Sequence, residues 1–113
     1  IELLVTSPAK RAFDTAKLWR LHSGMAGHNV RTDSRIYRAE SPDLLRLIGS
    51  IDEEVNNLML IGHNPGITDL VNDLVRDRTI SIPASGIVRL FLPVANWYEV
   101  ESEKALLVSM EFT

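Results

Sequence analysis

Short apolar runs alternate with amphipathic stretches along most of the chain. Residues 3–5 (Leu-Leu-Val) and 58–61 (Leu-Met-Leu-Ile) have the length and unbroken apolar character of buried strands. Each run is followed by apolar residues at helical spacing, over 9–19 and over 67–74. This alternation predicts a three-layer α/β domain, in which a mainly parallel sheet carries helices on both faces.

The remaining apolar positions predict shorter elements. Arg35-Ile36-Tyr37 could form a short second strand, and residues 44–48 have the apolar spacing of a short helix. Residues 87–92 form another apolar run. From Leu106 to Thr113, apolar and more polar residues alternate, as in a strand with one face more buried than the other. We expect these last two strands to be antiparallel, at one edge of the sheet.

Three of the predicted helices begin with a polar residue followed by proline, at Ser7-Pro8, Ser41-Pro42 and Asn64-Pro65. The polar residue suits the N-cap, and proline suits the first helical position. The first and third pairs come just after a buried strand, and open α/β sheets bind ligands beyond the carboxyl ends of their strands. A helix N-terminus at that edge favours a phosphate group, because it offers free N–H groups and a positive dipole end.

Arg11 is expected in the first turn of the helix that follows Ser7. Helical side chains lean toward the helix N-terminus, so the guanidinium can reach back over the strand end, where its planar fork of donors matches a phosphate. The alternative is a solvated arginine on a helix surface, the interpretation that a lone arginine favours and that we adopt for Lys10. Thr15 lies one turn after Arg11 on the same face and could steady it.

His63 is expected between a strand end and the next helix cap, after Gly62, which permits close backbone approach to a ligand. An imidazole there can donate a hydrogen bond to an anion or shuttle a proton. The alternative, of equal weight, is a loop histidine that bonds to local backbone groups. His22 and His28 are predicted to be solvated, at a helix end and in a polar loop.

Composition narrows the class of protein. The 113 residues, 45% of them hydrophobic, fit one globular domain over residues 1–113. The net charge of −3 gives no basic field for nucleic acid or an anionic membrane, and no apolar run is long enough to cross a bilayer. The absence of cysteine excludes disulfides, thiol catalysis and thiolate metal sites. We expect a cytoplasmic protein with no cofactor and, since no ligand pair has suitable spacing around His63, no metal site.

Four segments together resemble the histidine phosphatase superfamily, whose members include the phosphoglycerate mutases. Residues 4–16 resemble its SSPxxRAxxTA stretch, and residues 61–66 (Ile-Gly-His-Asn-Pro-Gly) resemble its GHNPG stretch. Residues 37–45 resemble the short segment between them. The tail, residues 83–90, is similar to the phosphohistidine phosphatases of the SixA type in particular. The matches cover nearly the whole chain in the family's order and spacing.

The resemblance implies a pocket of two histidines and two arginines, in which Arg11 and His63 bind and neutralise the transferring phosphoryl group. The family's nucleophilic histidine lies in an Arg-His-Gly motif on an earlier strand, and no Arg-His-Gly occurs in this chain. We therefore expect a domain that is N-terminally incomplete, lacking that strand and its helix. If the complete protein also lacks the motif, covalent catalysis by this route is excluded.

The resemblance further implies a phosphohistidine phosphatase acting on a phosphorylated protein, such as a histidine-phosphorylated signalling protein. Imidazole leaves without much help, whereas ester hydrolysis needs a general acid. Glu40 is the candidate acid, although we favour a role at the N-terminus of the next helix. Ser85 could contact phosphate, although a turn-forming serine is the simpler interpretation. The alternatives are a general phosphomonoesterase and a non-catalytic phosphate- or phosphoprotein-binding module.

Overall fold

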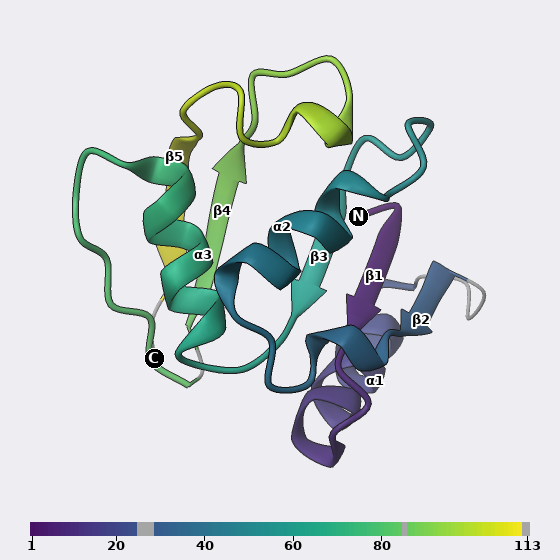
Figure 1. Cartoon of the computed structure of the whole chain (residues 1–113). Helices are drawn as coiled ribbons and strands as arrows, with labels where there is room; N and C mark the ends of the chain where they lie inside the picture. The colour runs from purple at the N-terminus through teal and green to yellow at the C-terminus, as the bar shows by residue number, and fades with distance from the viewer. Residues whose placement is uncertain (25–28, 85, 112–113) are drawn as a thin grey trace.

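A parallel sheet of three strands lies at the centre of the computed structural model, which describes residues 1–24, 29–84 and 86–111 (Figure 1). The strands are β1 (Leu3–Thr6), β2 (Val30–Thr32) and β3 (Leu58–Ile61), in the order β2-β1-β3. All four residues of β1 are buried, as the unbroken apolar run predicts. The parallel pairing places the carboxyl ends of β1 and β3 side by side, with Thr6 opposite Ile61.

The prediction of a strand at residues 35–37 is wrong. The second strand is β2, and Ser34–Ile36 forms a short 3₁₀ helix, η2. Asp33 causes the turn, because its Oδ1 accepts a hydrogen bond of 2.9 Å from the N–H of Arg35. The turn also buries Ile36 in the core, which a solvent-facing strand end would not do.

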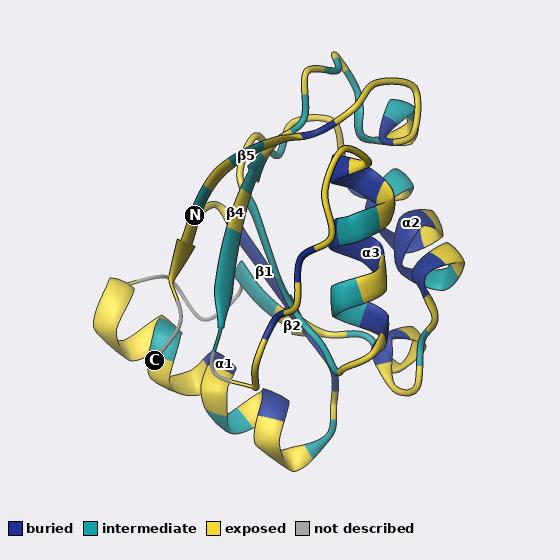
Figure 2. Ribbon diagram, turned by 90° about the vertical axis from the view of Figure 1, so that its left-hand side faces the viewer, coloured by how far each residue is buried: buried dark blue, intermediate teal, exposed yellow. Residues whose placement is uncertain are grey.

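The helices lie on both sides of the parallel sheet, as predicted. Figure 2 shows α2 (Ser41–Gly49) and α3 (Gly66–Val75) on one side of the strands, and α1 (Lys10–Ser23) on the other. The main core lies between the sheet and α2, and its buried members include Val5, Leu44 and Leu47. The core on the α1 side of the sheet is smaller, because Ala12 and Ala16 are the buried residues of this helix.

Two antiparallel strands, β4 (Ile87–Phe91) and β5 (Leu106–Glu111), follow α3. Their antiparallel pairing confirms the prediction, but they form a separate sheet instead of extending the parallel one. The long connection between them contains the 3₁₀ helix η3 (Trp97–Glu99). One face of this pair packs against α3 through Val88, Leu90 and Leu107, around Val71 and Val75.

Several apolar side chains of β4 and β5 are exposed. They are Phe91, Leu106, Val108 and Met110, each between 43% and 56% exposed. Exposure alternates along β5 from Leu106 to Met110, but the less polar residues are the exposed ones. Within the described ranges, no helix is long and apolar enough to span a membrane.

Candidate functional site

The first strand–helix junction begins later than its sequence suggests. Helix α1 starts at Lys10, with Ala9 at its N-cap, so Ser7 and Pro8 precede the helix. Ser7 is fully buried, and its Oγ accepts a hydrogen bond of 3.2 Å from the N–H of Ala9. Arg11 is the second residue of α1, so it lies in the first helical turn, as predicted.

The second junction, after β3, contains His63. Helix α3 starts at Gly66 with Pro65 at its N-cap, so Asn64 is one residue too early to be the predicted cap. Asn64 instead connects two segments: its Oδ1 accepts from the Thr68 hydroxyl at 2.7 Å, and its Nδ2 donates to the carbonyl of Ile82 at 2.7 Å. These bonds fix the loop that carries His63.

Gly62 has a packing role that the sequence does not reveal. A Cβ at this position would approach the side chains of Ile67 and Ile36 to 3.0–3.1 Å, which is tighter than ordinary van der Waals contact. The glycine therefore lets α3 and the η2 turn close around the end of β3. No ligand is needed to explain it.

The two junctions meet at the carboxyl end of the parallel sheet. The N–H of Ser7 donates to the carbonyl of Ile61 at 3.0 Å, so the pairing of β1 and β3 continues into the loops. The hydroxyl of the same residue, Ser7 Oγ, lies 2.8 Å from His63 Nε2. The segment leading to Arg11 and the loop bearing His63 are thus joined by a side-chain contact.

An open hollow of about 510 Å³ lies beside His63. Its walls are residues 37–42 and 63–66, together with Asp69 of α3. The edge of the Tyr37 ring meets His63, with ring centroids 5.9 Å apart and planes at 87°. Arg38 has φ of 58°, an uncommon backbone conformation for a residue with a side chain, and its guanidinium lies 5.3 Å from the centre of the Tyr37 ring.

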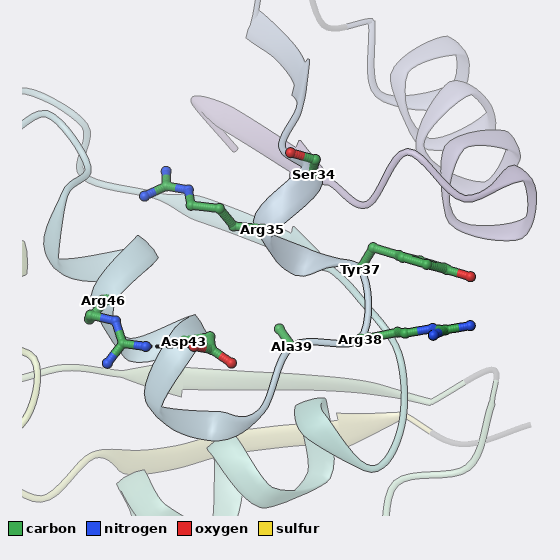
Figure 3. Close-up of a pocket in the computed structure, with 7 residues that line it drawn as sticks. All are labelled: Ser34, Arg35, Tyr37, Arg38, Ala39, Asp43 and Arg46. Atoms are coloured by element: carbon green, nitrogen blue, oxygen red, sulfur yellow. Dashed lines mark hydrogen bonds and ion pairs between the residues drawn. The ribbon is translucent and has the colours of Figure 1, made fainter.

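A second hollow, of about 410 Å³, adjoins the first and shares Tyr37, Arg38 and Ala39 with it. Figure 3 shows Arg46 beside Asp43, whereas Tyr37 and Arg38 extend side by side, away from that pair. Arg46 pairs with Asp43 at 2.5 Å, and Arg35 pairs with Asp33 at 2.6 Å. Among the described residues, no carboxylate forms an ion pair with Arg38, so its charge is available at the rim of both hollows.

The hydrogen bonds from Arg35 stabilise the ionised form of Asp33 and lower the pKa of that carboxyl group. Burial acts in the opposite direction, and more weakly. Asp33 therefore stays charged at neutral pH and holds Arg35, which lines the second hollow.

The remaining predicted residues are Glu40, Ser85 and His28. Glu40 is the N-cap of α2, and its N–H donates to Asp43 Oδ2 at 3.0 Å, which agrees with the favoured interpretation as a helix start. It also lines the hollow beside His63, so its role as an acid stays a prediction. Ser85 and His28 lie outside the described residues.

Several surface assignments on α1 are confirmed. His22 is exposed in the last turn, and Lys10 is an exposed partner of Asp14 at 2.9 Å. Thr15 bonds the backbone carbonyl of Arg11 at 2.9 Å and does not contact its guanidinium. Steadying of the Arg11 side chain by the Thr15 hydroxyl is therefore not observed.

The sequence did not assign Ser7, Tyr37 or Arg38 to the neighbourhood of His63. The sequence predicts Ser7 to be a helix cap, and Tyr37 and Arg38 belong only to a segment that carries the family resemblance. The signal that could have placed them is the parallel pairing of β1 with β3, which brings sequence-distant loops to one edge. Among the described residues, no group of three or more histidine or acidic side chains is arranged to hold a metal ion.

The parallel sheet with helices on both sides makes this an α/β protein, and its likeness to a solved structure identifies the histidine phosphatase fold. A solved structure with the provisional name phosphohistidine phosphatase SixA, from Nakamurella multipartitia, superimposes with a TM-score of 0.84. The match covers 99% of this chain and 70% of that one, at 18% sequence identity. It confirms the predicted fold.

The chain belongs to the same family as the uncharacterized protein ML1117 of Mycobacterium leprae, to which it is 30% identical. The alignment covers 96% of this chain and 70% of the mycobacterial protein. No family model matches the chain.

Proposed function

We propose that this chain forms the phosphate-binding part of a phosphohistidine phosphatase, with Arg11 and His63 as phosphate ligands. The observation that carries the proposal is the 2.8 Å contact between Ser7 and His63, which joins the two junctions at one sheet edge. Arg11 lies in the first turn of α1 at that edge, and α3 begins there after His63. A bound phosphate would meet a guanidinium, an imidazole and helix N–H groups together.

The proposed reaction has two steps. A histidine outside these 113 residues, in an Arg-His-Gly motif, attacks phosphorus while the bond to the substrate's imidazole nitrogen breaks and that nitrogen takes up a proton. Water then attacks the phosphohistidine of the enzyme, which releases phosphate and restores the histidine. Arg11 and His63 stabilise the charge on the phosphoryl oxygens in both steps. Ser85 remains a further candidate contact.

The proposed substrate is a phosphorylated protein, and a histidine-phosphorylated signalling protein in the cytoplasm suits the chemistry best. The fold shared with a structure that bears a phosphohistidine phosphatase name supports this class. If Glu40 is a general acid instead, alkyl phosphate esters are also substrates. In that case Glu40→Gln slows hydrolysis of an alkyl phosphate while leaving phosphoramidate hydrolysis unchanged, because only the ester needs protonation of a poor leaving group.

Phosphate binding is tested on the chain itself by a thermal-shift titration with inorganic phosphate and with vanadate. The wild type is expected to gain stability as ligand is added, by mass action. Arg11→Ala and His63→Ala should each weaken the response at least tenfold in midpoint concentration. Arg20→Ala and His22→Ala are matched controls, since both residues are exposed in the last turns of α1.

Turnover is tested on the full-length product of the gene, with phosphohistidine and phosphoramidate as substrates. Hydrolysis that is lost in both site variants supports the phosphatase. Phosphate-dependent stabilisation without hydrolysis supports the binding module, which the lack of Arg-His-Gly within these residues favours as the second candidate. Equal responses of the site variants and the controls would contradict the assignment of the site.

A further inference from the structure

Ser7 occupies a position that a helix cap does not explain. Ser7 is completely buried, and its N–H continues the pairing between β1 and β3 by donating to the carbonyl of Ile61. The helix it was expected to cap begins three residues later, at Lys10. A buried hydroxyl needs hydrogen-bond partners, so the contacts of Ser7 Oγ indicate its role.

The Ser7 hydroxyl has two neighbours. Its oxygen accepts from the N–H of Ala9 at 3.2 Å and lies 2.8 Å from His63 Nε2. A hydroxyl has one proton to donate and two lone pairs. The bond from Ala9 uses one lone pair, and His63 Nε2 is the other hydrogen-bond partner of this hydroxyl among the described residues. If Nε2–H donated to the second lone pair, the buried hydroxyl proton would have no acceptor, so the proton is donated to the imidazole nitrogen.

This geometry has a consequence for the tautomer of His63. A neutral imidazole carries one N–H, so a ring that accepts at Nε2 carries its proton on Nδ1. Among the described residues, none forms a hydrogen bond with Nδ1. The Tyr37 ring lies T-shaped to the imidazole, with ring centroids 5.9 Å apart, and His63 itself lines the hollow that Arg38 borders.

We propose that Ser7 is a positioning residue that holds neutral His63 in the Nδ1–H tautomer and thereby presents Nδ1–H to the bound phosphoryl group. When the ring is protonated, Nε2–H donates to Ser7 Oγ instead, so the contact persists in both states. The identity of the anion rests on the proposed function. The assignment of the tautomer does not, because it depends only on the contact between Ser7 and His63.

The tautomer is measured directly by long-range ¹H–¹⁵N correlation on protein labelled at its histidine rings. The spectra are recorded at about pH 8.5, roughly two units above the ordinary histidine pKa. The chain has three histidines, and His63→Ala identifies the signals of His63 by their loss. The wild type should show a protonated Nδ1 and an unprotonated Nε2. Ser7→Ala should move His63 toward the Nε2–H form that free imidazole side chains prefer.

Ser50→Ala is the matched control, because Ser50 also has a hydroxyl bonded within the protein, to the carbonyl of Leu47 at 2.6 Å, but lies at the end of α2. In Ser50→Ala, the ring signals of His63 should equal those of the wild type. Ser7→Cys serves where Ser7→Ala fails to fold, since a thiol nearly preserves the volume but donates weakly. An Nε2–H tautomer in the wild type, or an unchanged tautomer in folded Ser7 variants, would overturn the proposal.

The same variants connect the tautomer to ligand binding. Ser7→Ala should weaken binding of inorganic phosphate roughly fivefold, the effect of losing one orienting hydrogen bond. A variant that changes the tautomer but binds phosphate like the wild type would overturn the positioning role. A wild-type chain that does not respond to phosphate would contradict the proposed function, while the ring spectra would still decide the role of Ser7.

Discussion

Asp33 is held by several hydrogen bonds from Arg35. The Nε of Arg35 donates to its Oδ1 at 3.0 Å, and Nη2 donates to its Oδ2 at 2.6 Å. The N–H of Asp33 also donates to the carbonyl of Thr6, at the end of β1. The backbone of Asp33 therefore joins the sheet edge where His63 lies, while its side chain holds Arg35 of the η2 turn, so its charge state affects that turn.

Replacing Arg35 with glutamine is expected to raise the pKa of Asp33 toward its ordinary value of about 3.9. Because the folded-state pKa is lowered, the ion pair stabilises the fold above the unfolded-state pKa and loses this effect as pH falls through the folded-state value. Arg35→Gln should therefore destabilise the protein at pH about 7 more than at pH about 3. Urea unfolding at both pH values, with carboxyl ¹³C titration, measures this.

Arg20→Gln is the control for that comparison, because Arg20 is exposed on α1, and no ion pair within the described ranges includes it. Its unfolding free energy should change equally at both pH values. An equal loss for Arg35→Gln at the two pH values would contradict the linkage to Asp33.

At the scale of elements, the start of α3 is fixed by its contact with the loop before α2. Gly66, the first residue of α3, is buried, and a Cβ there would collide with the carbonyl oxygen of Ala39. That oxygen belongs to the backbone, so it cannot move aside as a flexible side chain would. Because residues 37–39 and His63 line one hollow, this contact sets its width.

Gly66→Ala is expected to destabilise the protein by about 1–3 kcal/mol, the usual cost of forcing extra volume into a packed site. It should also weaken phosphate binding, since α3 and the His63 loop must shift. Gly49→Ala is the control: Gly49 ends α2, and a Cβ there would meet its nearest atom, in Tyr98, at an ordinary 3.6 Å. Chemical denaturation compares the two, and equal stability would contradict the proposed clash.

At the scale of elements, some features could be predicted from the sequence and others could not. The buried strands and the three main helices follow from apolar spacing, a local property. Ser7 and Ser41 both precede proline, yet their hydroxyls bond distant residues, His63 and Asp73 respectively. These partners are 56 and 32 residues away, and sheet pairing and helix packing bring them near. The local sequence pattern cannot specify such long-range bonds. The predicted helix starts and the predicted contacts of these two serines are therefore wrong for the same reason.

At the scale of the whole molecule, the two sheets have unequal surroundings. The parallel sheet has helices on both sides, whereas, among the described residues, β4 and β5 pack against one helix, α3 (Figure 2). The same two strands expose Phe91, Leu106, Val108 and Met110. Exposed apolar surface promotes association. Because the less polar residues of β5 are the exposed ones, alternation alone did not identify its buried residues.

Replacing Leu106 and Val108 together with threonine is expected to reduce binding of the dye ANS, because apolar surface is removed while β propensity is retained. The unfolding free energy should change by less than about 1 kcal/mol, since both side chains are exposed. Leu107→Thr, on the face that packs around Val71 and Val75, should instead cost about 1–3 kcal/mol of stability. Light scattering checks the mass of each variant in solution. A double variant that unfolds as easily as Leu107→Thr, or that loses mass relative to the wild type, would show that Leu106 and Val108 are covered in solution, against the exposure that the structure gives them.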